Sequence, residues 1–155
     1  MKTASLNDIK KELSNRDSAD LLEYCLRLAK FKKENKELLQ YLLFEADDIL
    51  TYINGVKNEI EEQFLQMNKS SIYFIKKSVR KILRNINKQI RFLLPKQVEA
   101  ELLIQFCNCI IKHSIPIKKS RQLNNIYENQ LKKVDKALAS LHPDLQYDLK
   151  RELIL

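Results

Sequence analysis

Apolar side chains recur at steps of three or four residues along most of this chain, which is the spacing of amphipathic helices. The pattern is most regular in two neighbouring segments, residues 36–67 and 71–94. Only three residues separate the segments, so the two helices they predict are expected to pack as antiparallel neighbours. Both apolar seams repeat at about 3.5 residues, which favours left-handed, coiled-coil-like packing.

The first of these segments contains the only glycine of the chain, Gly55. The dipeptide Asn54-Gly55 normally marks a turn. However, the apolar positions keep the same phase on both sides of it, and a turn would be expected to shift that phase. We therefore predict one continuous helix over about 36–67, with Gly55 as the place where it would kink.

Shorter amphipathic segments lie before the long pair. Residues 5–14 predict a short helix with Ser5 as its N-cap, because Ser accepts hydrogen bonds from the free backbone N–H groups of a first turn. A second helix is predicted to begin at Asp17 or Ser18 and to bury an apolar face that includes Cys25. Two short helices in succession predict a helical hairpin over residues 1–33.

The C-terminal half predicts three more helices. Residues 96–113 are apolar on most sides, which is typical of a helix at the centre of a bundle. Residues 120–141 and 143–153 are amphipathic. The whole chain, residues 1–155, is therefore predicted to be a single all-α domain. Its fold would be a helical bundle of six or seven helices built on the antiparallel pair 36–67 and 71–94, with the hairpin 1–33 as a candidate subdomain.

Composition agrees with this fold. The 155 residues include one Gly and three Pro, whereas sheet proteins use Gly and Pro in many tight turns. The most apolar run, Leu102 to Ile111, is interrupted by polar residues and is shorter than the roughly 20 residues that span a bilayer. We therefore expect no membrane span. The polar start of the chain and three cysteines without a disulfide-rich spacing predict a cytoplasmic protein.

The net charge of +8 comes from one part of the chain. Residues 63–98 carry nine Lys or Arg and no Asp or Glu, so this is a basic protein chiefly because of its predicted helix 71–94. The candidate polyanion-binding residues on this helix are Lys77, Arg80, Lys81, Arg84, Lys88 and Arg91. Tyr73 is a candidate for stacking on a base. The acidic residues Glu59, Glu61 and Glu62 are expected near Lys76 and Lys77, where they would neutralise part of the charge.

Three interpretations of the basic helix are open. The plainest is that the cations form a solvated face and keep an amphipathic helix soluble. The second is salt-dependent, sequence-tolerant binding of DNA or RNA phosphates, for which Arg is the best donor. The third is attraction to anionic lipid. It is less favoured because the apolar seam of the helix is expected to be occupied by the preceding helix.

Cys107, Cys109 and His113 suggest a metal site at first sight. Positions two apart on a helix point about 200° away from each other, so both thiols cannot bind one ion while the helix is intact. We therefore predict no metal site and no cofactor. Cys25, Cys107 and Cys109 are interpreted as buried structural thiols, because free Cys is among the most buried residue types.

Catalytic motifs are not found in the sequence. The carboxylate pairs Glu45 with Asp48 and Glu59 with Glu62 have no Glu-x-x-His partners, so they predict solvated acidic faces. A Gly-rich phosphate loop is ruled out because the chain has one glycine. The sequence therefore predicts a protein that is not an enzyme.

The function that the pattern favours is a structural or protein-interaction module that binds another protein or associates with itself. Long helices with heptad-like seams commonly mediate such association. The alternative is weak, sequence-tolerant nucleic-acid binding, to DNA or RNA, through the basic helix 71–94.

Overall fold

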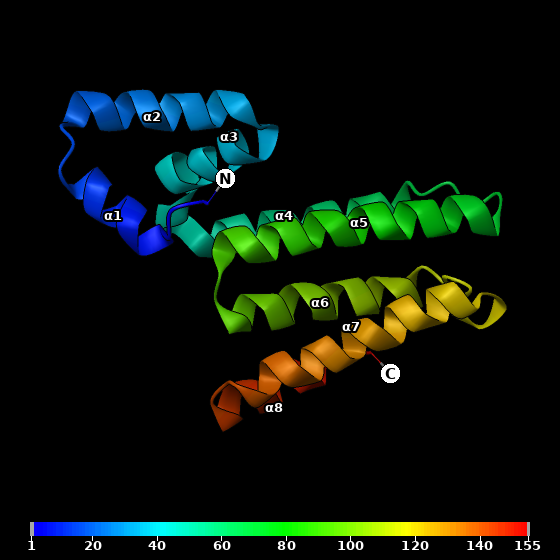
Figure 1. The fold of residues 1–155 in the computed structure, drawn as a ribbon. Helices are drawn as coiled ribbons and strands as arrows, with labels where there is room; N and C mark the ends of the chain where they lie inside the picture. Colours follow the sequence, from blue (N-terminus) through cyan, green and yellow to red (C-terminus); the bar gives the residue numbers. More distant parts are fainter. Residues whose placement is uncertain (1, 155) are drawn as a thin grey trace. The chain divides into compact units, whose positions relative to one another are not determined.

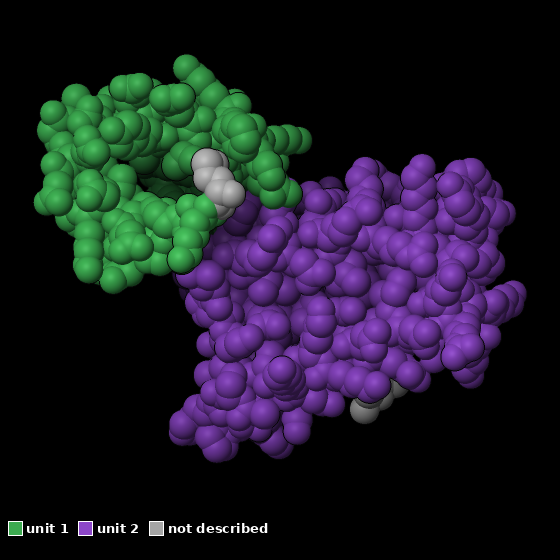
Figure 2. Space-filling model, viewed as in Figure 1, with its two compact units in different colours: residues 1–47 green, residues 48–155 purple. Residues whose placement is uncertain are grey.

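The computed structural model describes residues 2–154 and shows α-helices joined by short turns, with no strand in this range (Figure 1). The predicted all-α helical bundle is confirmed. The chain divides into two compact units, residues 1–47 and residues 48–155, which Figure 2 colours separately. The single domain over 1–155 stays a prediction, because this division does not test whether the units fold independently.

Unit 1, residues 1–47, contains three short helices: α1 (Leu6–Ser14), α2 (Ser18–Phe31) and α3 (Lys33–Gln40). The predicted N-cap Ser5 is confirmed, since its hydroxyl accepts a hydrogen bond from the backbone N–H of Asp8, and the Asp8 carboxylate accepts one in return. Asp17 caps α2 in the same way. Within this unit α2 packs against α3, and Asn35 closes the turn between them by donating to the carbonyl oxygen of Leu28 at 2.8 Å.

The helix predicted over 36–67 is divided instead of continuous. After α3 the backbone forms one π-helical turn (Tyr41–Glu45) and one 3-10 turn (Ala46–Asp48), and α4 begins at Ile49. Asp48 leaves the helical conformation, with φ −125° and ψ 70°, and its carboxylate accepts from the backbone N–H of Thr51 at 3.2 Å. Asp is a strong N-cap, so the helix restarts here. Gly55, where a kink was predicted, lies inside the uninterrupted α4 (Ile49–Leu65).

Unit 2 begins with the antiparallel pair α4 and α5 (Ile72–Leu93), which contact each other; α5 lies in front of α4 in Figure 1. Ser71 caps α5, because its hydroxyl accepts a hydrogen bond from the backbone N–H of Phe74. Tyr52, near the start of α4, donates a 2.6 Å hydrogen bond to Gln89, near the end of α5, which fits antiparallel packing. The remaining elements are α6 (Lys96–Lys112), a 3-10 turn (Ile117–Lys119), α7 (Arg121–Ala139) and α8 (Pro143–Glu152).

Helix α6 is the centre of unit 2, as the sequence predicted. It packs against α4, α5, α7 and α8. Its buried positions lie on most sides of the helix: Val98, Ala100, Leu102, Leu103, Ile104, Phe106, Cys107, Cys109 and Ile110. The ion pair between Lys57 of α4 and Glu101 of α6, 2.8 Å long, joins the two helices outside this core. Of the predicted buried thiols, Cys107 and Cys109 are buried, but Cys25 is exposed because α2 buries none of its residues.

No helix within the described residues is long and apolar enough to cross a membrane. The run Leu102 to Ile111 was predicted to be too short to span a membrane, and this result agrees with that prediction. That run forms the buried middle of α6 instead.

Replacing Leu102 with Ala should destabilise the protein by about 2–5 kcal/mol, because the side chain is fully buried in α6 and its removal leaves a cavity. Denaturant unfolding followed by circular dichroism measures the change. Leu65→Ala is the control, since Leu65 of α4 is 70% exposed and should cost less than about 0.5 kcal/mol. Equal effects of the two substitutions would show that α6 is not the centre of the core.

Candidate functional site

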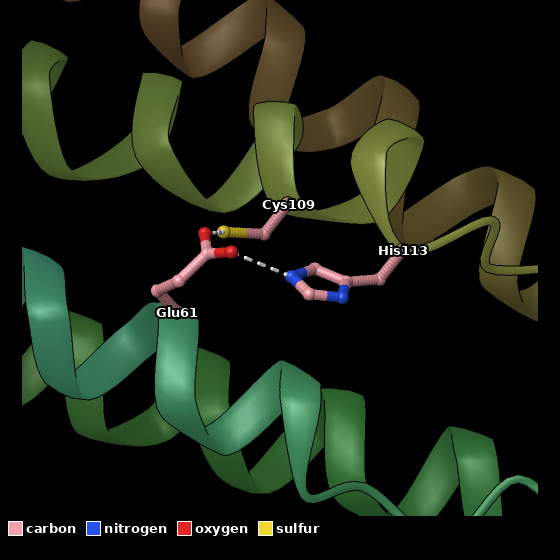
Figure 3. Close-up of side chains that lie close together, drawn as sticks. All are labelled: Glu61, Cys109 and His113. Carbon is pink, nitrogen blue, oxygen red and sulfur yellow. Dashed lines mark hydrogen bonds and ion pairs between the residues drawn. The ribbon is translucent and has the colours of Figure 1, made fainter.

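Three side chains with metal-ligating atoms meet between α4 and the end of α6: Glu61, Cys109 and His113 (Figure 3). Glu61 comes from α4, Cys109 from the last turn of α6, and His113 is the residue that ends α6. The Glu61 carboxylate accepts from the Cys109 thiol at 3.2 Å and from Nε2 of His113 at 2.9 Å. The ligating atoms of all three lie within 4.8 Å of one another.

The α-helical spacing of Cys109 and His113 places them on one side of α6. Residues four apart are neighbours on a helix surface, and the backbone N–H of His113 still bonds to the carbonyl oxygen of Cys109 at 2.9 Å. The imidazole ring lies nearly parallel to the ring of Phe64, with the centroids 5.9 Å apart. Phe64 is fully buried, so the histidine ring is held against a fixed surface.

Glu61 carries the charge of this cluster. Lys112 donates to Glu61 at 2.6 Å. This hydrogen bond is the largest cause that lowers the pKa of Glu61 to about 2, followed by the hydrogen bond from Cys109. Burial raises the pKa of Cys109 to about 12, and the neighbouring carboxylate adds to that effect. At neutral pH the cluster therefore combines a carboxylate and a protonated thiol beside the His113 ring.

This cluster was not predicted from the sequence. Cys109 belongs to the cluster, and Cys107, two positions earlier on the same helix, does not. Cys109 and His113 were weighed with Cys107 as metal ligands, but their Cys-x-x-x-His spacing, which is visible in the sequence, was not used. Glu61 was expected to face Lys76 and Lys77, but it contacts Lys112 and His113. Its partners come from a different helix than α5, which periodicity alone could not predict.

The candidate polyanion-binding residues lie on one face of α5. At about 100° per residue, the six positions fall within an arc of roughly 100°, opposite the apolar seam of Val79, Ile82 and Ile86. Lys88 is half-buried. The exposed members are Lys77, Arg80, Lys81, Arg84 and Arg91.

A hollow of about 480 Å³ opens beside the first half of this face. It is lined by Tyr73, Lys76, Lys77, Arg80 and Arg84 of α5 and by Gln122 of α7. No carboxylate belongs to this lining. Lys76 donates to Gln122 at 2.8 Å, which fixes the wall formed by the two helices. Tyr73 is 65% exposed and contacts the ring of Phe74 edge-on.

Unit 1 differs from unit 2 in what it leaves exposed. None of the residues of α1, α2 and α3 is buried. A hollow of about 840 Å³ lies along α2, α3 and the π-helical turn. Its apolar lining consists of Leu26, Ala29, Leu39, Leu43 and Phe44, and its polar lining of Lys30, Lys33, Lys36 and Gln40. A smaller hollow of about 200 Å³ includes Cys25 and Leu28 and shares Ala29 and Leu39 with the first.

Comparisons of the chain with protein-family models, with curated proteins and with solved structures find no significant match. What the protein does must therefore be inferred from its residues and their geometry.

Between pH 5 and pH 2 the protein should lose stability through Glu61. The folded-state pKa of Glu61, about 2, lies below its ordinary value of 4.5. Its contribution is therefore complete above about pH 4.5 and is lost as the pH falls toward 2. Urea unfolding at a series of pH values measures this loss.

Glu61→Gln is the test variant, and its stability should depend less on pH in this range than that of the wild type. Glu62→Gln is the control, because Glu62 is the exposed neighbour. An unchanged pH profile in Glu61→Gln would contradict the assigned hydrogen bonds.

Proposed function

We propose that the protein is a protein-interaction module, and that the apolar surface of α2 and α3 in unit 1 binds a helix of a partner protein. The observation that supports this most directly is the exposure of large apolar side chains throughout unit 1. They include Leu22, Leu26, Leu28, Phe31, Leu42, Leu43 and Phe44, of which Phe31 and Phe44 are more than three-quarters exposed.

Exposed apolar groups on this scale favour association. Single apolar residues at a surface are ordinary, but a contiguous apolar patch marks an interaction site. The larger hollow in unit 1 joins five apolar side chains from three successive elements, so its lining is contiguous. A helix has the diameter and side-chain spacing to lay an apolar face into such a groove.

Charge indicates which kind of helix fits. Lys30, Lys33 and Lys36 line the same hollow, and no acidic residue does. A partner helix with an apolar face flanked by Asp or Glu would bury its apolar side chains against Leu26, Leu39 and Leu43. Its carboxylates would then reach the three ammonium groups. We therefore assign an acidic amphipathic helix as the occupant.

A fluorescent peptide that forms an acidic amphipathic helix tests this proposal by anisotropy titration. Leu43→Asn should weaken binding by about 10- to 100-fold, because burying one Leu side chain contributes about 1.5–3 kcal/mol. Leu22→Asn is a matched control: Leu22 and Leu43 are both 62% exposed, but Leu22 lines neither hollow. Equal loss in both variants, or no binding by the wild type, would contradict the proposal.

Sedimentation of the protein alone separates the partner helix from self-association. A monomer at all concentrations agrees with the assigned occupant. A dimer that Leu43→Asn dissociates and Leu22→Asn does not would instead identify a second copy of this chain as the occupant.

A second candidate function is polyanion binding by the cationic face of α5, and it too is proposed. The hollow beside that face presents four Lys or Arg side chains and an exposed tyrosine without a carboxylate. From Lys77 to Arg91 the face is roughly 21 Å long at 1.5 Å per residue, a length that corresponds to about six steps of a nucleic-acid strand at 3.4 Å each. Contacts to phosphates alone would make the binding tolerant of sequence.

Replacing Lys77, Arg80 and Arg84 together by Gln should weaken binding of labelled DNA and RNA. The slope of log affinity against log salt should fall by about 2–3, because three phosphate contacts are lost. The control replaces Lys132, Lys133 and Lys136, exposed residues of α7, by Gln and removes the same charge elsewhere. If both triple variants weaken binding equally, net charge alone drives the interaction, and a defined site on α5 is contradicted.

Both functions are binding functions, and neither requires a catalytic residue. A cytoplasmic location belongs to the same proposal. It is supported by three free thiols, one of them exposed, since a reducing compartment preserves them.

A further inference from the structure

We propose that Glu61, Cys109 and His113 bind a divalent transition-metal ion of the zinc class. The proposal starts from their juxtaposition: an oxygen, a sulfur and a nitrogen ligand, from two helices, lie within 4.8 Å of one another (Figure 3). It concerns a different surface from the hollows of unit 1 and α5, so it does not depend on either proposed function.

The donor set matches this class of metal. Zn²⁺ is bound by Cys sulfur, His nitrogen and carboxylate oxygen, whereas Mg²⁺ and Ca²⁺ require mainly oxygen ligands. Soft thiolate and borderline imidazole together favour zinc and its neighbours in the first transition row. A lone cysteine or a cluster of carboxylates would not make this distinction, but the three different donors do.

The three donors can reach the separations of a tetrahedral site with a small movement. Bonds of about 2.0–2.3 Å place the ligand atoms of such a site roughly 3.3–3.7 Å apart. The thiol stands 3.2 Å from Oε2 of Glu61 and the imidazole nitrogen 2.9 Å from Oε1, because hydrogen bonds hold these pairs together. The ligand atoms of all three residues lie within 4.8 Å of one another. A small outward rotation of the Glu61 side chain, which is 30% exposed, would open space for the ion.

The residues around His113 hold its imidazole ring in place. His113 has a side chain only 11% exposed, and its ring is stacked on Phe64. When an ion binds, the neutral ring changes tautomer by exchange with solvent, losing its hydrogen at Nε2 and taking one at Nδ1, so that Nε2 coordinates through its lone pair. The Cys109 thiol releases one proton to solvent and binds as a thiolate. Two negative ligands then balance the two positive charges of the ion.

Lys112 is the competitor for this site. Its ammonium donates to the same oxygen of Glu61 that His113 contacts, at 2.6 Å and 2.9 Å respectively. The Lys112 side chain is 60% exposed, so it can move into solvent when the ion takes its place. Three protein ligands leave one tetrahedral position for water. The ion would join α4 to the end of α6 at this point.

Titration of the full chain with Co²⁺, in a Cys25→Ser background that removes the exposed thiol, tests the site. We expect one equivalent of Co²⁺ to produce a thiolate-to-cobalt charge-transfer band that Zn²⁺ abolishes. Cys109→Ser should remove the band, and His113→Gln or Glu61→Gln should each weaken binding by about tenfold or more. Cys107→Ser and His142→Gln are the matched controls and should leave the affinity within about threefold.

Lys112→Gln provides a test in the opposite direction. Removing the competing ammonium should strengthen Co²⁺ binding several-fold, whereas loss of a merely structural ion pair would not. Circular dichroism of each variant confirms that it is folded. The proposal is overturned if the wild type gives no band, if Cys109→Ser keeps it, if both controls lose it while folded, or if Lys112→Gln weakens binding.

Discussion

A helix that is apolar on nearly every side must be covered by other helices, and α6 imposes this constraint on unit 2. Residues from most of its circumference are buried, so α4, α5, α7 and α8 each contribute an apolar face around it. The burial of apolar surface is the dominant favourable term in folding. The polar outer surfaces of the surrounding helices are then free to carry charge, as the cationic face of α5 does.

The same constraint explains why the two units differ. Unit 2 has a central helix to bury, while unit 1 has short amphipathic helices and no buried residue in any of the three. A segment of fewer than 50 residues buries too little surface to be stable on its own without a further contact. Under the proposed function, a partner helix would provide that contact.

Sequence patterns predicted the elements that follow local rules. The cap Ser5 and the central position of 96–113 could be predicted because side-chain hydrogen bonding and helical periodicity are local. The restart of the helix at Asp48 could not be predicted, because the apolar positions keep the same phase through residues 36–67 and give no sign of a helix boundary. Nor could the meeting of Glu61 with Cys109 and His113, because it depends on how α4 rotates against α6. The exposure of Cys25 was missed for a related reason: an apolar face predicts burial only if another element covers it.

Amide hydrogen exchange of the full chain, followed residue by residue, tests the central claim that unit 2 has its own core while unit 1 requires a partner. The account predicts that amides of α6 exchange only through global unfolding, and that those of α2 and α3 exchange at least about a hundredfold faster. Equal protection of α2, α3 and α6 in the isolated protein would contradict it.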